Sequence, residues 1–305
     1  MKQTLLSLLL FFVGTVSGLA QSKRIASMEI EIGTRHYTST FSYDDQERIS
    51  QIQFTEDSDG RPAENNTVDY SYSGDDINIS HAYNSGTDTY AYHITDGKVQ
   101  TGEVFLDVDM VNENYTFSYE GDNLSEIVCQ YKSKEIRNVY SWTGSNPSKN
   151  TEYYKGKLDM EYTYTHNTMS THPLMHVLFG GIAGEGGILT LDEMIPLFAL
   201  YNYLGTIPAN LISEISQYDA YEGDSSELSV SYETDANDDV VKVTATRGSR
   251  TSVFIINWEG TDGIKNIVSP SRSNKEYFTL DGQHLQNQPT KKGIYIFNDR
   301  KVVVK

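Results

Sequence analysis

Two histidines four residues apart are the sharpest candidate for metal chemistry in this sequence. His172 and His176 would share one face of a helix, a spacing that suits zinc binding. The zinc-protease motif needs Glu directly after the first His, but Pro stands at position 173. His166 and Glu185 are possible further donors, but no spacing assigns either of them. We therefore expect ordinary core or surface histidines, and no metal ligand is assigned.

Two acidic segments resemble calcium-binding loops in the spacing of their oxygen ligands. Asp235–Asp239 carries acids and an amide at alternate positions, but it lacks glycine at the sixth position and has Thr246 at the twelfth. Asp57–Gly60 is a shorter fragment of the same kind. Asp, Asn and Gly are also the residues that close tight turns. We therefore expect both segments to be hairpin turns.

Nucleophilic and acid–base catalysis have no recognisable motif in this chain. Cys129 is the only cysteine, and it lies in the alternating run Glu126–Tyr131, which favours a buried thiol over a reactive one. A Gly-x-Ser-x-Gly elbow and a phosphate-binding glycine loop are both absent from the sequence. The 42 acidic residues make accidental carboxylate pairs unavoidable, so their spacing does not identify a glycosidase. No catalytic or cofactor-binding residue is assigned, and the interpretation leans away from an enzyme.

The composition limits the classes of partner. Lys and Arg number 24 against 42 Asp and Glu, which gives a formal net charge of −18. Binding to nucleic acid or to an anionic membrane surface requires clustered positive charge, so the composition disfavours both partners. The 305 residues suffice for one large or two modest domains with a real core.

The first 20 residues are expected to be a signal peptide that is removed on export. Lys2 precedes the apolar run Leu5–Val13, and Gly18–Ala20 places small residues where a signal peptidase cleaves. The apolar run is too short to cross a bilayer, and no later stretch reaches 18 apolar residues. We therefore expect an exported protein, whether periplasmic, cell-surface or secreted, without a transmembrane segment in the mature chain.

Residues 21–260 consist largely of one repeated unit. An aromatic-x-aromatic pair precedes a turn rich in Asp, Asn and Gly, and Ile, Leu or Val follows the turn. The pairs begin at Phe41, Tyr70, Tyr90, Phe117, Tyr140 and Tyr162, and a further copy, Val230–Tyr232, follows an interruption. Residues at i and i+2 share one face of a strand, so each unit predicts a β-hairpin with an aromatic face. Stacked hairpins would bury that face, which assigns most of the 22 tyrosines to the fold. The alternative is an exposed tyrosine stripe that stacks on sugars.

This pattern resembles a diverged tyrosine-aspartate (YD, or Rhs-type) repeat of secreted bacterial proteins of unknown function. The Gly-Arg that follows the Asp in such repeats is missing here, and Asp96–Val99 comes nearest to it. The resemblance implies a mainly β fold, with an extended or curved antiparallel sheet of repeated hairpins. The toxin and protease modules of large Rhs proteins are not visible in the sequence, so a shell around a toxin is not implied.

Residues 171–217 interrupt the repeat with a small α-helical insertion. Pro173–Phe179 predicts a helix that begins with proline and is stopped by a glycine pair. Thr190–Ile195 opens a second helix that ends at Gly205, and Pro208–Ile215 predicts a third, short helix. Their apolar residues are expected to pack on one face of the sheet. A lid or a partner-binding patch is the alternative.

Residues 261–305 are expected to form a linker and a small C-terminal β tail. Three segments predict strands joined by turns: Tyr277–Gln283, Lys292–Ile296 and Arg300–Lys305. Gly-Ile-Tyr at 293–295 and the Lys-rich, β-branched ending resemble the sorting domain of proteins exported through a type IX-like outer-membrane pathway. The resemblance implies a tail that export machinery recognises. A last hairpin that completes the core is the alternative.

These features predict an exported protein with a signal peptide at 1–20, a repeat β domain at 21–260 and a tail at 261–305. Its expected function is non-enzymatic binding or interaction at the cell envelope, with a glycan or another protein as the ligand. The alternative is a secreted hydrolase, for example one that acts on polysaccharide, with carboxylates in a cleft beside the helical insertion.

Overall fold

The computed structural model describes residues 23–58, 64–170, 172–181 and 191–259, together with four short segments between 277 and 304. The chain divides into two compact units, Met1–Gly260 and Thr261–Lys305, and each is described by itself. The expected signal peptide at 1–20 lies outside the described residues.

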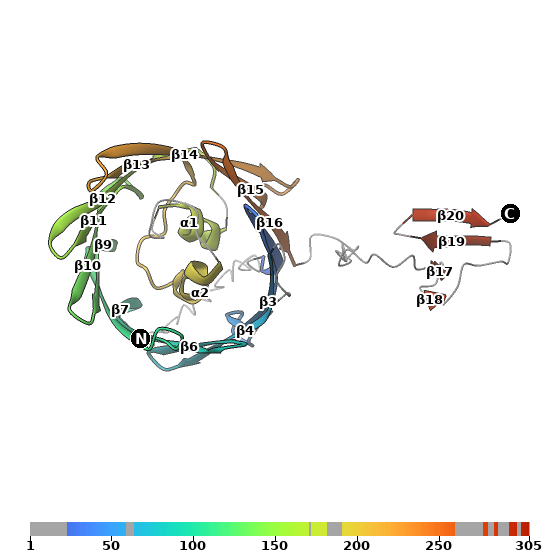
Figure 1. The fold of residues 1–305 in the computed structure, drawn as a ribbon, viewed down its shortest axis with the longest axis horizontal. Helices are drawn as coiled ribbons and strands as arrows, with labels where there is room; N and C mark the ends of the chain where they lie inside the picture. Colours follow the sequence, from blue (N-terminus) through green and yellow to red (C-terminus); the bar gives the residue numbers. More distant parts are fainter. Residues whose placement is uncertain are drawn as a thin grey trace, which may run out of the picture. The chain divides into compact units, whose positions relative to one another are not determined.

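The first unit contains a closed antiparallel barrel whose strands run from β1 to β16 in chain order (Figure 1). Each strand pairs with its neighbours in the chain, and the barrel closes where β1 pairs with β16. The strands are β1 Ile25–Ile32, β2 Arg35–Tyr43, β3 Ile49–Ser58, β4 Glu64–Ser73, β5 Asp76–Tyr83, β6 Gly86–Thr95, β7 Lys98–Leu106, β8 Val111–Glu120, β9 Asn123–Tyr131, β10 Lys134–Thr143, β11 Asn146–Tyr154, β12 Lys157–His166, β13 Ile212–Asp219, β14 Asp224–Thr234, β15 Val240–Arg247 and β16 Arg250–Trp258.

Closure of the barrel corrects the expectation of an extended or curved sheet. Met28 and Ile30 of β1 lie opposite Ile256 and Phe254 of β16. Pairing of the first and last strands removes both sheet edges, whose unpaired backbone groups would otherwise attract other chains. The hairpin repeat predicts which strands are neighbours within the sheet. It contains no local signal for the contact between Ser27 and Asn257, which are 230 residues apart.

The barrel wall has a polar outer face and an apolar inner face, because successive side chains of a strand point to opposite sides. In β2, Tyr37 and Phe41 are buried while Thr38 and Thr40 are exposed. Exposed residues at the outward positions of four other strands are Asp69, Ser71 and Ser73 on β4, Asn112, Asn114, Thr116 and Ser118 on β8, Thr163 and Thr165 on β12, and Ser229, Ser231 and Glu233 on β14. Large exposed hydrophobic side chains in the described part of the chain are few, namely Val108, Met110, Leu158, Tyr218, Tyr221 and Ile255.

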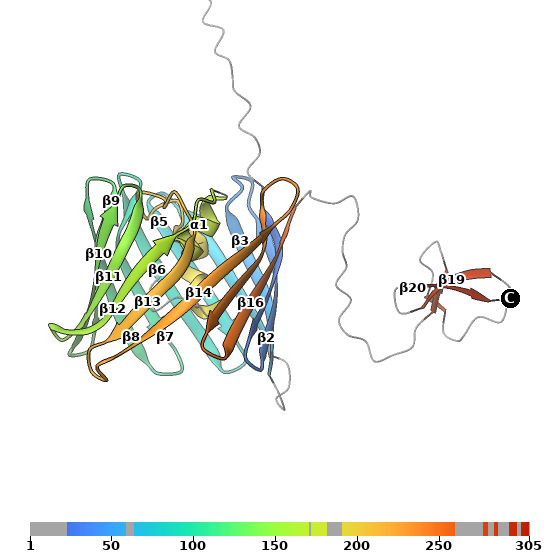
Figure 2. The ribbon, with the colours of Figure 1, turned by 90° about the horizontal axis from the view of Figure 1, so that it is seen from above.

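Two helices lie inside the barrel (Figure 1), and the side view shows them within the tilted strands (Figure 2). Helix α1 spans Pro173–Phe179 and α2 spans Leu191–Leu200. A barrel of about sixteen strands is too wide for its wall side chains alone to fill, which leaves room for apolar helices. The expected packing of the insertion on a sheet face is thus realised on the inner face. Of the helices in the described residues, none is long and apolar enough to span a bilayer.

The prediction of a third helix at Pro208–Ile215 is wrong. Ile212–Asp219 is strand β13, which pairs with both β12 and β14. Ile212 and Ile215 are three residues apart, which suits a helix, but a register shift between Thr165 and His166 lets a strand bury both of them. Hydrogen bonding to two neighbouring strands outweighs the weak helical pattern of this short segment.

The helices and the inner wall share one hydrophobic core. Phe198 of α2 packs edge-on against Phe41 of β2, with ring centroids 5.2 Å apart. Phe179 of α1 packs in the same way against Phe254 of β16 at 5.3 Å. The Tyr70 hydroxyl of β4 donates to a carbonyl of α2 at 3.1 Å. Burial of the apolar helices therefore stabilises the closed wall, and the wall in turn shields the helices from water.

The segment that follows α2 crosses one end of the barrel. Thr206 N–H donates to the Asp122 carbonyl in the β8–β9 turn at 2.7 Å, and Asn210 N–H donates to Asn146 Oδ1 of β11 at 3.0 Å. Gly205 has a φ of +78°, and a Cβ at this position would lie 2.1 Å from the Asp122 carbonyl oxygen. Only glycine permits this close crossing. The segment therefore covers the turns that it contacts.

The second aromatic residue in five of the repeat units, like Trp258 at the end of β16, has a defined bonding role. Its ring faces the interior, and its hydroxyl or indole N–H donates to a carbonyl at the start of the preceding strand. The donor–acceptor pairs are Tyr43–Ile25, Tyr72–Ile49, Tyr119–Val99, Trp142–Leu124, Tyr232–Ile212 and Trp258–Val240, at 2.7–3.0 Å. Every acceptor lies at a register shift, where regular ladder pairing is interrupted. Tyrosine or tryptophan therefore supplies a donor that phenylalanine lacks.

Replacing Tyr72 by phenylalanine is expected to lower the free energy of unfolding by about 1–3 kcal/mol, because the Ile49 carbonyl loses its donor. The Arg48 guanidinium, 4.0 Å from the Tyr72 ring centre, can still stack on the phenylalanine ring. Urea unfolding followed by tryptophan fluorescence measures the change. The control is Tyr221→Phe, whose side chain is 87% exposed and whose unfolding should match the wild type. Equal stability of both variants would show that the hydroxyl bond contributes nothing.

The second unit is a small four-stranded sheet in the order β18-β17-β19-β20. Its strands are β17 Tyr277–Thr279, β18 His284–Leu285, β19 Gly293–Phe297 and β20 Arg300–Val304. Three of them lie in the segments expected to form strands, and β18 adds a fourth. The β18 segment is too short to show the alternation that predicts a strand.

Candidate functional site

The outer wall of the barrel is hollowed across strands β4 to β8. The hollow has a volume of about 400 Å³, and we call it the outer groove. Its outward-facing lining residues are Asp69 and Ser71 of β4, Asn78 and Ser80 of β5, Thr89 and Ala91 of β6, Glu103 and Phe105 of β7, and Asn112 and Asn114 of β8. The wall between them belongs to Ile79, Tyr90, Val104 and Glu113, whose side chains face inward by the alternation of the strands.

Strand register arranges the lining of the outer groove in two parallel rows. One row is Ser71, Asn78, Ala91, Glu103 and Asn114, and the other is Asp69, Ser80, Thr89, Phe105 and Asn112. Ala91 and Thr89 stand at the centres of the rows, with longer side chains toward β7 and β8. Beneath the groove, Gly102 lets the Tyr92 ring lie against the inner wall, because a Cβ there would come within 2.6 Å of the ring. The hollow thus follows from side-chain size along the two rows.

The outer groove is polar and acidic. Asp69 and Glu103 supply two carboxylates, and none of the described residues that line the groove is Lys or Arg. Asp69 is held in place by Gln51, whose Nε2 donates to Oδ1 at 2.7 Å. Amides and hydroxyls fill most other positions, and these groups both donate and accept hydrogen bonds. The groove can therefore bind a neutral polar ligand, whereas its charge opposes an anion.

The two carboxylates of the outer groove are poorly placed for glycoside hydrolysis. Asp69 and Glu103 lie on β4 and β7, three strand spacings or about 14 Å apart along the wall. Glycosidases hold their carboxyl pair about 5–9.5 Å apart. The hydrolase alternative placed its carboxylates in a cleft beside the helical insertion. In the structure, α1 and α2 instead pack into the hydrophobic core. Neither location supports the hydrolase alternative.

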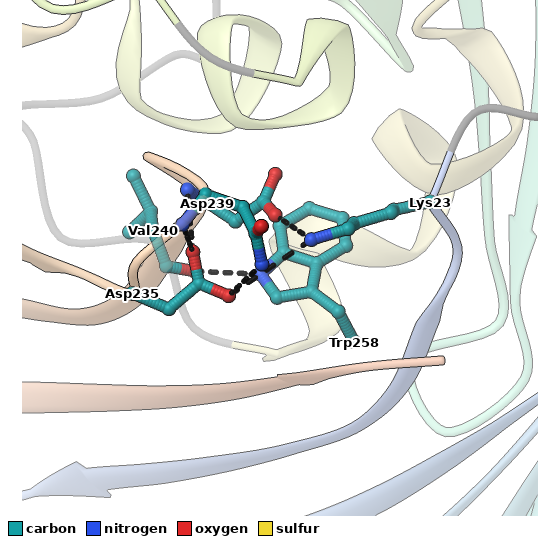
Figure 3. Close-up of polar contacts among 6 residues, drawn as sticks. Lys23, Asp235, Asp239, Val240 and Trp258 are labelled. Carbon is teal, nitrogen blue, oxygen red and sulfur yellow. Dashed lines mark hydrogen bonds and ion pairs between the residues drawn. The ribbon is translucent and has the colours of Figure 1, made fainter. Parts of the chain in front are cut away.

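Asp235–Asp239 closes the turn between β14 and β15, as the turn interpretation predicted (Figure 3). Asp235 Oδ1 accepts hydrogen bonds from the N–H groups of Asn237 and Asp239 at 2.8 and 3.0 Å. These bonds hold the pKa of the Asp235 carboxyl below its usual value despite some desolvation. Lys23 Nζ pairs with Asp239 and lies 3.9 Å from Asp235 (Figure 3). The carboxylates thus stabilise a turn at the seam of the barrel. The second segment, Asp57–Gly60, lies partly outside the described residues.

His172 and His176 do not form a pair on one helix face. His172 precedes α1 as its N-cap, where its Nδ1 accepts from Leu174 N–H at 3.1 Å. Its ring lies 5.1 Å from the Trp258 ring, and burial lowers its pKa to about 4, although Asp239 opposes this shift. His176 lies within α1 and is 3% exposed. His172 is therefore neutral at pH 7 and caps a buried helix.

The two possible further metal donors, His166 and Glu185, do not complete a site. His166 Nε2 lies 3.2 Å from the Gly180 carbonyl, and burial lowers the pKa of this histidine. Glu185 lies outside the described residues. Within the part of the chain that the structure describes, no three His, Cys, Asp or Glu side chains gather as a metal site would require.

Cys129 is buried on the inner face of β9, as its place in an alternating strand predicted. Burial raises the pKa of its thiol to about 11, and the Tyr115 hydroxyl beside it only partly offsets the shift. A thiol that stays protonated at neutral pH is a poor nucleophile. Cys129 therefore acts as a small core residue.

The alternative of a sugar-stacking tyrosine stripe is wrong. The repeat aromatics face the interior, where Tyr70, Tyr140 and Tyr162 are 3–6% exposed. The exposed tyrosines in the described residues are Tyr218 and Tyr221, and neither belongs to a repeat pair. Burial on a wide inner wall, rather than ligand binding, accounts for these rings.

Two porin-like proteins are among the solved structures that share this fold. One is a porin-like protein from Bacteroides uniformis ATCC 8492, with a TM-score of 0.53 and 14% sequence identity over 77% of this chain and 96% of that chain. The other is a porin-like protein from Bacteroides vulgatus ATCC 8482, with a TM-score of 0.56 and 13% identity over 77% of this chain and 98% of that chain. The sequence itself matches no protein-family model and no curated protein. At these identities the likeness concerns the fold alone.

The sequence interpretation missed the outer groove. Its residues are ordinary outward positions of hairpin strands, such as Asn112 and Asn114 of β8. The available signal is the alternation that marks Ser71, Thr89 and Ala91 as outward. That signal does not tell which residues of different strands lie side by side, because their alignment depends on the register.

Proposed function

We propose that this protein is an exported, non-enzymatic binding protein of the cell envelope, and that it works in water through the outer wall of a filled barrel. The polarity of the wall is the observation that carries the proposal. A membrane-spanning barrel presents an outward apolar band about 25 Å tall between aromatic girdles, with a polar interior. Here Thr38, Thr40 and Ser42 face outward from β2, whereas Tyr37 and Phe41 face the core.

The filled interior supports the same proposal. Porins with about sixteen strands leave an aqueous channel along the barrel axis. In this chain the inner wall is mostly apolar, with a few buried polar residues such as Asn150 and Glu152. It packs on α1 and α2, and Phe198 and Phe254 are almost fully buried. The segment after α2 also bonds to the turns at one end, through Asp122 and Asn146. A ligand therefore meets the outer wall, and the porin-like character of the two fold neighbours is not extended to this chain.

Export is the second part of the proposal, and it rests on the sequence. The basic and apolar segment at 1–20 supports passage across the inner membrane. The resemblance of residues 261–305 to a sorting domain supports a further step through export machinery. With a single cysteine the exported chain can form no internal disulfide, so its stability must come from its core.

Detergent partitioning and bilayer conductance test the proposal on the exported full chain. We expect the protein to remain in the aqueous phase of a Triton X-114 separation, because its outer wall is polar. Added to a planar lipid bilayer, it should produce no conductance steps, whereas an outer-membrane porin under the same conditions should. Partition into the detergent phase together with stepwise conductance would overturn the proposal.

A further inference from the structure

We propose that the outer groove across β4 to β8 binds a neutral oligosaccharide. This inference rests on the proposed function, because it names the ligand class of an outer-wall binding protein. It concerns the outer surface, from which the side chains of the repeat tyrosines point away, and it assigns a role to polar residues that the fold itself does not require.

The size of the outer groove suits a short sugar chain. Ligand sites in proteins commonly enclose about 300–1,000 Å³, and the groove, at about 400 Å³, lies at the lower end of that range. The two rows run across five strands, so the groove is elongated across the strand direction. An elongated, open hollow fits a few linked sugar units better than a compact, enclosed cofactor.

The hydrogen-bonding groups of the outer groove match sugar hydroxyls. A sugar hydroxyl donates one hydrogen bond and accepts others, and so do the hydroxyls of Ser80 and Thr89. The Asn112 and Asn114 amides each provide two donors and an acceptor on exposed β8 positions. Asp69 and Glu103 accept two hydrogen bonds or more and suit vicinal hydroxyls. Sites rich in Ser and Asn provide adaptable polar contacts of this kind.

Phe105 provides the apolar surface that a sugar ring needs. It points outward on β7 directly opposite Thr89 and Asn112, and it is partly buried by its neighbours. A ring held at the side of a polar groove can pack against the C–H face of a pyranose. Ala91 and Thr89 leave the adjacent floor low, so a sugar can lie beside the Phe105 ring.

Charge and backbone pairing exclude anionic ligands and peptides that bind by strand addition. Phosphate, sulfate and nucleic acid need Lys or Arg, which are absent from the described lining of the outer groove. The carboxylates of Asp69 and Glu103 would also repel uronic acids. An extended peptide binds by adding a strand to an open sheet edge. Every strand of this barrel is paired on both sides, so the wall offers no such edge.

Two variants test the outer groove on the full chain. Ala91→Leu fills the floor without removing a polar contact, and Phe105→Ala removes the apolar surface. Their matched controls are Ala82→Leu, at an outward position of β5 outside the lining, and Ile255→Ala, on the outer face of β16. Circular dichroism and urea unfolding establish that all four variants fold. Binding is measured with cello-, xylo-, manno- and N-acetylated chito-tetrasaccharides, with tetragalacturonate as the acidic comparison.

We expect at least one neutral tetrasaccharide to bind with a Kd below about 1 mM, and tetragalacturonate to bind more weakly. Ala91→Leu and Phe105→Ala should each weaken binding by about tenfold or more, with both controls close to the wild type. The inference is overturned if no neutral tetrasaccharide binds, or if the groove variants bind as tightly as their controls. A protein that stays in water and conducts nothing yet fails this test overturns this inference alone, because the bilayer experiment decides the proposed function separately.

Discussion

Replacing Phe198 by alanine is expected to lower the free energy of unfolding of the barrel by about 3–5 kcal/mol. Phe198 is 1% exposed in the last turn of α2, and its ring packs edge-on against Phe41 of the wall. The truncation removes a large apolar surface and leaves a cavity. A closed wall, hydrogen-bonded around its whole circumference, cannot collapse far enough to fill that cavity.

Tryptophan fluorescence measures the stability of the barrel separately from that of the C-terminal sheet. The two tryptophans of the chain, Trp142 and Trp258, both lie on barrel strands, so urea unfolding followed in this way does not report the C-terminal sheet. The control is Ile255→Ala on the outer wall, which is expected to cost less than about 1 kcal/mol because its side chain is 36% exposed. If Phe198→Ala costs no more than this control, the helices are not part of the core that holds the barrel together.

The barrel is also expected to lose about 3 kcal/mol of stability as the pH falls from 7 to 4, through His172 alone. Burial lowers the pKa of His172 from 6.5 to about 4 in the folded chain. Above pH 6.5 the residue is neutral in both states, and its contribution to stability is fully present. Between pH 6.5 and 4 the His172 side chain is protonated in the unfolded chain but still neutral in the folded chain, so the free energy of unfolding falls. Below pH 4 both states are protonated and the loss is complete.

His172→Asn tests this pH dependence. Asparagine is a good helix N-cap and does not titrate, so the variant retains the cap of α1 and loses the proton linkage. Urea midpoints measured from pH 7 to 4 should fall less steeply for the variant, with a difference of about 3 kcal/mol over the range. The control is His93→Asn on the outer wall, where His93 lies 2.9 Å from Asp76 and is half exposed. If His172→Asn follows the wild-type slope, this residue does not carry the acid sensitivity.

The loss of stability that we assign to His172 occurs in a different pH range from the loss that arises from the turn carboxylates. Hydrogen bonds and Arg48 hold the pKa of Asp44 below 3.8, and Asn237 and Asp239 do the same for Asp235. Stability from lowered carboxyl pKa values is present above their unfolded pKa and is lost only as pH falls below it. The decline between pH 6.5 and 4 therefore belongs mainly to buried histidines, which include His166.

A barrel wall offers a rigid platform for a binding site. The strands of the outer groove are paired on both sides, and Tyr92 and Val104 beneath them are buried in the core. Such a wall loses little conformational entropy when a ligand binds, which favours affinity for weakly held ligands. The stability tests on Phe198 and His172 therefore examine the filled interior of the barrel, and the binding tests on Ala91 and Phe105 examine the outer face of its wall.

The sequence by itself determined the local structure of this protein. Alternation within each strand, together with Asp, Asn and Gly at the turns, marked the hairpins. The aromatic pairs also indicated which face is buried, and Tyr70 and Tyr140 are buried as that pattern predicts. Pro173 and the apolar run after it marked α1. These signals are local because they arise from neighbouring residues and from the turn chemistry between them.

Only the tertiary structure decided how these pieces are used. Pairing of β1 with β16 turned a row of hairpins into a barrel, and pairing on two sides made Ile212–Asp219 a strand instead of a helix. The apolar inner wall of the barrel then buries α1 and α2 in a shared hydrophobic core. The outer groove arose where the register aligned Ala91 with Glu103 and Asn114 in one row, and Phe105 with Asn112 in the other. The closure of the barrel, the filling of its interior and the register of its strands depend on contacts between residues far apart in the chain. Each of them reflects burial and strand pairing over the whole wall, and no single segment of the sequence determines it.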